Sequence, residues 1–314
     1  MALPIPARSG RFGVRGARRP PVWRKRALRV LLYVAVGLIL LWTLAPFLWL
    51  FLSSIFPYKE LIAPRASHWW PTQPTFANYL ALFQRQEQTG ELFLFALRNS
   101  TVVAGSVTLV CLFFGTLGAY ALARLPVSHK NAWVLSLLVI RMLPTIALVI
   151  PFFVIVSLID YRFLGWGLEF HLFDTKLNLV ILYTTFIIGF VIWIMRGYFL
   201  AVPPDLEEAA RIDGCTRMQS LWRVILPLSA PGLVATGILA FLLAWDEFLL
   251  ALVFTRSTNA MTLPLFIAQL GSQYVTRYDQ IATAGVLASL PPVLLAMAFQ
   301  RFIVSGLTMG STKG

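Results

Sequence analysis

The chain has 314 residues, of which 58% are hydrophobic and only 12% are charged. That is too little polar surface to cover a water-soluble globule of this size, so the composition predicts a protein embedded in a lipid bilayer. The formal net charge of +13 does not indicate nucleic-acid binding, because residues 1–29 carry nine lysines and arginines and no acidic residue. The charge is therefore a local feature of one end of the chain.

A basic arm, residues 1–27, precedes the first long apolar stretch. Lysines and arginines beside a membrane span stay on the cytoplasmic side and attract anionic lipid, so we expect this arm in the cytoplasm. A cleaved signal peptide is the alternative. The apolar stretch at residues 28–51 is too long for a signal-peptide core and has no small-residue cleavage site, which favours a membrane helix.

Six apolar stretches are long enough to cross a bilayer as helices, covering approximately residues 28–51, 99–123, 132–159, 177–195, 232–254 and 281–304. The sequence therefore predicts an all-α membrane protein, with one transmembrane domain over residues 28–304 and a tail over residues 305–314. Because the basic arm is expected inside, both termini and the polar loop 196–230 should be cytoplasmic.

The two cysteines and three histidines do not suggest a chemical site. Cys111 lies in an apolar run and Cys215 in a polar loop, so they are expected at different depths and no disulfide is predicted. His68, His129 and His171 stand in separate loops, and we expect no metal site.

Arg141 lies about nine residues into the third apolar stretch. At about 1.5 Å per residue this is close to the middle of the bilayer, where an unpaired cation costs several kcal/mol. We therefore expect Arg141 to be buried in the helix bundle or to line the translocation pathway. Trp245, Asp246 and Glu247 in the fifth stretch are further candidates for buried polar or pathway residues. On a continuous helix Asp246 and Glu247 would point about 100° apart, so at most one could face Arg141.

The polar segment 203–227, between the fourth and fifth stretches, predicts two short helices outside the membrane. Asp205 follows two prolines and could cap the first helix, with Glu208 completing a capping box. Gly214 would end this helix in a left-handed conformation. The residues expected on one face of it are Leu206, Ala209 and Ala210.

The second short helix is expected to begin at Thr216, because Thr216 and Gln219 have the spacing of another capping box. It should end at Pro227, since proline lacks the amide hydrogen that a helix interior needs.

Anchors at fixed spacing run through this segment: Glu208-Ala209-Ala210, Gly214 and Val224-Ile225-Leu226-Pro227. They resemble the EAA loop of the membrane subunits of ABC importers, whose pattern is E-A-A, three residues, G, nine residues, I or V, one residue, and L-P. Residues 95–314 further resemble carbohydrate-importer permeases of the type of the second maltose or trehalose permease subunit. The segments that carry this resemblance include Arg141-Met142-Leu143-Pro144, Phe173-Asp174-Thr175, Ile212-Asp213-Gly214 and Ala244-Trp245-Asp246-Glu247-Phe248. The chain departs from the family at Asp246, where asparagine is usual, and in its last residues.

The resemblance implies the type I permease fold of ABC importers, with six transmembrane helices and a cytoplasmic coupling helix. It implies a membrane subunit of an ATP-driven, binding-protein-dependent sugar importer in the inner membrane of a prokaryote. The implied partners are a homologous second permease, two ATP-binding subunits that hold ATP and Mg²⁺, and an extracytoplasmic sugar-binding protein. No catalytic residue and no cofactor is expected in this chain.

The resemblance also assigns residues to these partners. Coupling to the ATPase subunits is expected at Glu207, Glu208, Ala209, Ala210, Asp213, Gly214, Leu226 and Pro227. The tail residues Thr312, Lys313 and Gly314 are expected to reach the ATPase interface.

Other classes of function are less well supported. An ion-coupled secondary transporter could use Arg141, Asp246 and Glu247 as a relay, but it has no need of a loop such as 203–227. A membrane-embedded enzyme would need a nucleophile–base or metal-ligand pattern, and none is visible. The chain also has no phosphate-binding loop with which to hydrolyse ATP by itself. The sequence does not identify the transported sugar.

Overall fold

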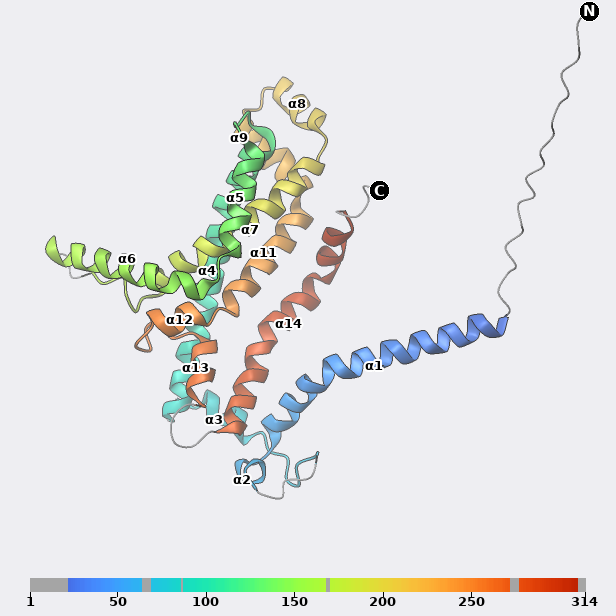
Figure 1. The fold of residues 1–314 in the computed structure, drawn as a ribbon, viewed down its shortest axis with the longest axis vertical. Helices are drawn as coiled ribbons and strands as arrows, with labels where there is room; N and C mark the ends of the chain where they lie inside the picture. The colour runs from blue at the N-terminus through green and yellow to red at the C-terminus, as the bar shows by residue number, and fades with distance from the viewer. Residues whose placement is uncertain (1–21, 64–68, 86, 168–169, 272–276, 310–314) are drawn as a thin grey trace, which may run out of the picture. The chain divides into compact units, whose positions relative to one another are not determined.

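The computed structural model describes residues 22–63, 69–85, 87–167, 170–271 and 277–309 (Figure 1). Within these residues every regular element is a helix, which confirms the predicted all-α fold. The tail residues Thr312, Lys313 and Gly314 and most of the basic arm lie outside the described residues.

The first membrane helix, α1 (Val22–Ile55), begins before the expected span at residue 28. Its side chains from Arg26 to Trp49 are exposed. A helix that is apolar on all sides in this way is typical of a membrane span. The chain divides into two units within this helix, residues 1–49 and 50–314, and the second unit contains all the other helices.

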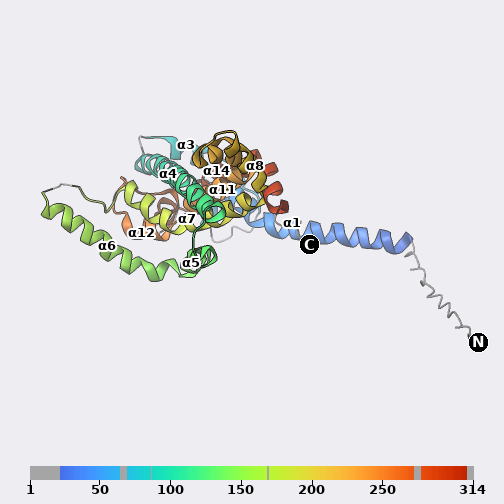
Figure 2. The ribbon, with the colours of Figure 1, turned by 90° about the horizontal axis from the view of Figure 1, so that it is seen from above.

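The core of the second unit is built from long helices that pack closely. They are α4 (Gln88–Arg124), α7 (Lys176–Ala201), α11 (Ala230–Trp245) and α14 (Tyr278–Met309). α4 and α7 lie side by side, and α11 packs against both of them and against α14 (Figures 1 and 2). A Cβ atom added at Gly115 of α4 would lie 2.7 Å from a methyl carbon of Val191 on α7. Small residues at such contacts let membrane helices approach each other closely.

In the part of the chain that the structure describes, five helices are long and apolar enough to cross a membrane. The number rises to six if the bent pair Arg217–Leu228 and Ala230–Trp245 counts as one span, with an angle of 82° between its two parts. The helices thus fit the expected six-span permease fold.

The prediction that residues 132–159 form the third span as a single helix is wrong. The chain instead forms α5 (Lys130–Met142) and α6 (Thr145–Gly165), separated at Leu143 and Pro144. Proline disfavours a helical conformation in the residue before it, and Leu143 is extended, with ψ at 128°. In Figures 1 and 2, α6 runs across the direction of α7 and leaves the bundle.

The fifth expected span, residues 232–254, is also interrupted. α11 ends at Trp245, and α12 (Leu249–Phe254) begins after three residues without helical structure. The next helix is α13 (Leu263–Gln269). The prediction that Asp246 and Glu247 lie on one continuous helix is therefore wrong.

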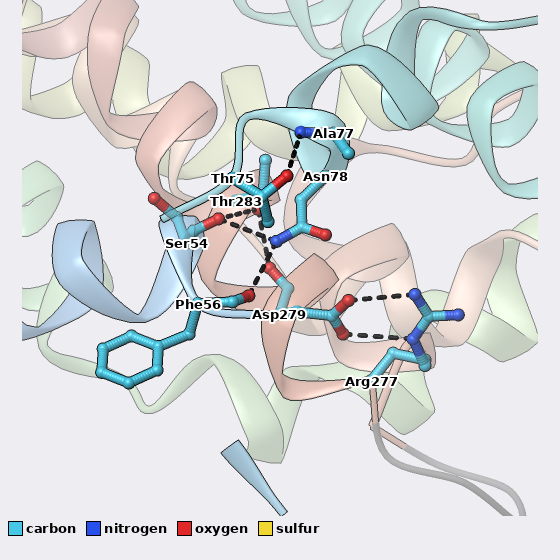
Figure 3. Close-up of polar contacts among 8 residues, drawn as sticks. All are labelled: Ser54, Phe56, Thr75, Ala77, Asn78, Arg277, Asp279 and Thr283. Atoms are coloured by element: carbon cyan, nitrogen blue, oxygen red, sulfur yellow. Dashed lines mark hydrogen bonds and ion pairs between the residues drawn. The ribbon is translucent and has the colours of Figure 1, made fainter. Parts of the chain in front are cut away.

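Two short helices, α2 (Tyr58–Leu61) and α3 (Ala77–Phe83), follow α1, and hydrogen bonds hold α3 at one end of the unit (Figure 3). The side-chain amide of Asn78 donates to the carbonyl oxygens of Ser54 and Phe56, at 2.9 and 3.1 Å. This one side chain therefore ties the start of α3 to the last turn of α1 and the residue that follows it.

The first turn of α14 reaches the same place. The Thr283 hydroxyl donates to the carbonyl oxygen of Asp279 at 2.7 Å and lies 3.3 Å from that of Ser54. The buried Asp279 carboxylate accepts two hydrogen bonds from Arg277, at 3.1 and 2.9 Å (Figure 3). These bonds raise the pKa of Arg277 above its ordinary value. An ion pair with one buried member thus satisfies the Asp279 carboxylate at the start of α14.

The close contact of α4 with α7 can be tested with two glycines of α4. We expect Gly115→Ala to lower stability by about 1–3 kcal/mol, because the new methyl group overpacks against Val191. Gly105 has no atom within 4 Å of an added Cβ, so Gly105→Ala should be neutral or stabilise the helix by up to about 1 kcal/mol. The measurement is thermal unfolding of each purified variant in detergent. Equal changes in Tm would contradict the close contact.

Candidate functional site

The loop predicted outside the membrane contains two short helices, as expected. The first, α8, runs from Pro204 to Ile212. The prediction that Asp205 caps it is wrong, because the N-cap is Pro203, two residues earlier, and it makes no side-chain cap hydrogen bond. Proline suits the first helical position, where its missing amide hydrogen costs nothing. Asp205 lies in the first turn, where a negative charge favours the helix dipole.

α8 ends at Gly214 as predicted. Gly214 has φ at +90°, and its amide donates to the carbonyl oxygen of Arg211 at 3.1 Å. The amide of Cys215 donates to the carbonyl oxygen of Ala210 at 3.0 Å. These two bonds make a Schellman motif, which ends the helix and turns the chain sharply.

The second short helix is confirmed with one change. Thr216 and Gln219 form the expected capping box, with bonds of 2.8 and 3.3 Å. The helix then continues past Pro227, through α9 (Arg217–Ser220), the π-helical turn η1 (Leu221–Ile225) and α10 (Leu226–Leu228). Leu226 is half-buried and Pro227 exposed.

Glu207 anchors α8 to the end of α4. Its carboxylate accepts a hydrogen bond of 2.6 Å from the Tyr120 hydroxyl and lies 3.5 Å from Nε of Arg124. Arg124 also donates to the carbonyl oxygens of Phe199 and Val202, at 2.7 and 2.6 Å, where α7 ends. One arginine therefore joins the ends of α4 and α7 to the first turn of α8.

Tyr120 and Arg124 were not among the site residues predicted from the sequence. Their spacing, i and i+4, puts both on one face at the end of a long apolar helix. That spacing is the one sequence signal for a shared polar partner. It does not identify the partner as Glu207, which lies 87 residues beyond Tyr120.

A stripe of exposed apolar side chains runs along α8, between the exposed charged residues Asp205, Glu208 and Arg211. Leu206, Ala209 and Ile212 recur at intervals of three residues and are exposed, Ile212 to 85%. Glu208, Asp213 and Gly214 are exposed too. Ala210 is only 9% exposed. The prediction that Ala210 shares the outward face with Leu206 and Ala209 is therefore wrong, because its methyl group faces its own protein.

Arg141 is exposed in this chain, so it is not buried among the chain's own helices. The alternative expectation, that it lines the translocation pathway, stays a prediction. Arg141 lies in the last turn of α5, and its guanidinium carbon is 4.0 Å from the centre of the Phe190 ring on α7. The break at Leu143 and Pro144 leaves it at a helix end instead of the middle of a long span. Within the described ranges no ion pair joins Arg141 to Asp246 or Glu247, so the structure does not assemble these three as a relay.

The three candidates at the end of α11 have different surroundings. Trp245 is buried, and its indole donates to the carbonyl oxygen of Ala288 on α14 at 3.1 Å. Asp246 is exposed. Glu247 accepts hydrogen bonds from the amides of Leu250 and Ala251, at 2.9 and 3.3 Å, and so caps α12. Trp245 and Glu247 thus hold the break in place.

Comparison with known proteins gives the family of the chain. The family model for the inner membrane component of binding-protein-dependent transport systems matches residues 112–309. The chain belongs to this family. Its similarity to sugar permeases agrees with the resemblance found in the sequence, and it is a transport subunit rather than an enzyme.

Several relatives cover almost the whole chain. The trehalose transport system permease protein SugB of Mycobacterium tuberculosis is 36% identical over 301 residues, which is 95% of this chain and 100% of that protein. The sulfoquinovosyl glycerol transport system permease protein SmoH of Agrobacterium fabrum is 36% identical, over 90% of this chain and 93% of that one. The trehalose/maltose transport system permease protein MalG of Thermococcus litoralis is 32% identical, over 91% and 97%.

Solved structures show the same fold. A bacterial ABC transporter involved in the import of the acidic polysaccharide alginate matches with a TM-score of 0.70 at 22% identity, over 88% of this chain and 97% of that one. A second structure, of a bacterial alginate ABC transporter in complex with its alginate pentasaccharide-bound periplasmic protein, matches with a TM-score of 0.65 at 20% identity, over 88% and 95%.

The anchor of α8 can be tested at two adjacent glutamates. We expect Glu207→Ala to destabilise the attachment of α8 by about 1–3 kcal/mol, because it leaves Arg124 without its carboxylate. Glu207→Gln should be milder, since its amide oxygen can still accept from Tyr120. The exposed Glu208 is the control, and Glu208→Ala should change stability by less than about 0.5 kcal/mol. The measurement is hydrogen exchange of the α8 amides. Equal protection in the two alanine variants would show that Glu207 does not hold the helix.

Proposed function

We propose that this chain is one of two membrane subunits of an ATP-driven, binding-protein-dependent sugar importer. Its relatives include transport system permeases for trehalose, maltose and sulfoquinovosyl glycerol, which favours a sugar or sugar derivative as the substrate. The complex of the similar alginate transporter with a periplasmic protein supports delivery by an external binding protein. A homologous second permease would complete the translocation pathway.

We further propose that α8 docks onto an ATP-binding subunit, which would hold the ATP and Mg²⁺. The observation that carries this proposal is the exposed apolar stripe of Leu206, Ala209 and Ile212 on a helix fixed at its base. Exposed apolar side chains on a polar loop favour a protein partner. In this arrangement the loop, the basic arm and the C-terminal tail are all cytoplasmic. The tail residues Thr312, Lys313 and Gly314 would then lie on the same side as the ATPase subunits.

The test of the docking proposal is bulk at Ala209. Ala209→Trp should weaken retention of the ATP-binding subunit by about tenfold or more, since overpacking an interface costs about 1–3 kcal/mol. The variant should still insert into the membrane, because Ala209 is exposed. The measurements are copurification of the ATP-binding subunit and ATP hydrolysis stimulated by the binding protein.

Ala132→Trp is the matched control, because Ala132 is an exposed alanine of α5 outside the loop. It should leave both measurements unchanged. Normal copurification and normal stimulated hydrolysis in Ala209→Trp would refute docking through α8. Ala210→Trp is not a suitable test, since its side chain would disturb the packing of the loop itself.

A further inference from the structure

We propose that Arg141, Phe190 and Trp193 form a contact site for a neutral carbohydrate on the translocation pathway. The site lies on the face where the end of α5 meets the middle of α7. This inference rests on the proposed function as a sugar importer, and it adds residues of this chain that would contact the substrate.

The depth of Arg141 makes its exposure significant. Eleven residues separate it from Lys130 at the start of α5, which is about 16 Å of helix and so near the middle of a hydrocarbon core of about 30 Å. Among the described residues no hydrogen bond or ion pair engages its guanidinium, whose contact is the ring of Phe190. A cation facing lipid at this depth costs several kcal/mol. This face must therefore be covered by something polar.

The neighbouring face of α7 is aromatic. Phe190 and Trp193 are three residues apart, and their rings lie 6.2 Å apart at an angle of only 28°. Phe190 is half-buried, whereas 46% of Trp193 is exposed. Phe186 continues the same face but packs against Phe152 of α6. The open part of the aromatic face is thus the part next to Arg141.

The backbone beside Arg141 is also unusual for a membrane interior. α5 ends at Met142, and the extended Leu143 is exposed. The last turn of a helix leaves carbonyl groups without an intrahelical donor. Non-helical backbone at membrane depth occurs only where protein buries it or where it lines a water-filled cavity. The last turn of α5 therefore carries both Arg141 and carbonyl groups that lack a donor within the helix.

A carbohydrate matches this combination of groups. Its hydroxyl groups can donate to the carbonyl oxygens of the helix end and accept from the five N–H donors of Arg141. The C–H faces of its ring can pack on Phe190 and Trp193, as apolar surfaces do on aromatic rings. An ion would use the charge but not the rings, and a lipid chain would use the rings but not the charge. The other possible occupant is a side chain of the second permease, which the experiment separates.

The experiment uses the complete complex in proteoliposomes. Trp193→Cys is placed in a Cys215→Ser background, and Cys111, which is 0% exposed, is left in place. The probe is a membrane-impermeant anionic methanethiosulfonate. Leu109→Cys is the control, because Leu109 is 70% exposed on an apolar face of α4. We expect Trp193→Cys to react at least about tenfold faster than Leu109→Cys, and its reaction to be slowed when trehalose, maltose or diacetylchitobiose is supplied with the binding protein.

Absence of reaction at Trp193→Cys would overturn the proposal, because the face would then be covered by the second permease or by lipid. A second result would also overturn the proposal: the wild type transports at least one of the three sugars, but none of them slows the reaction at Trp193→Cys. The site would then be open to water but would not contact the substrate. This readout does not depend on the rate of transport.

Transport gives a second readout that separates this site from the proposed function. Trp193→Ala should lower the rate of sugar uptake about three- to tenfold, and Trp193→Phe should restore most of it, because one aromatic packing contact is lost and then regained. The control is Trp133, an exposed tryptophan that lies on α5. The Trp133→Ala variant should transport normally. Unchanged uptake in Trp193→Ala, in a complex that retains its ATP-binding subunits, would count against the site alone. Failure of the wild-type complex to transport any of the three sugars would instead count against the proposed function.

Discussion

The close contact between α4 and α7 positions both candidate sites of this chain. Lipid tails are as apolar as leucine side chains, so helices in a membrane associate through close packing rather than through the hydrophobic effect. Gly115 permits that packing against Val191. At one end the two helices supply the groups that hold α8, and halfway along α7 they fix the aromatic face beside α5. Both the candidate coupling site and the candidate sugar site therefore depend on one helix pair.

The sequence predicted the kinds of structure better than their limits. Long apolar runs identified the membrane helices because backbone groups in lipid must be paired within a helix. Gly214 and the Thr216–Gln219 pair were read correctly because their geometry is local. The spans at 132–159 and 232–254 were predicted to be continuous, since hydropathy does not respond to the break at Pro144 or to the bonds that Glu247 makes with α12.

The details of the candidate site depended on contacts that no local pattern contains. Tyr120 and Glu207 are 87 residues apart, and their bond exists only because α4 and the end of α7 lie together. The same is true of Arg141 and Phe190, which meet across α5 and α7. The side of α8 that Ala210 faces likewise depends on where the following π-helical turn lies. Tertiary packing decided each of these.

The anchor at Arg124 has a mechanical consequence. Its guanidinium touches both the carboxylate on the first turn of α8 and the carbonyl groups at the end of α7, while its own backbone belongs to α4. A load applied along α8 would pass into two membrane helices at once, with no length of slack chain between them. Because Glu207 also accepts a hydrogen bond from Tyr120, the first turn of α8 is held at two points and resists tilting. The loop is therefore better described as a short helix fixed to the membrane helices by charged and polar contacts than as a flexible connector.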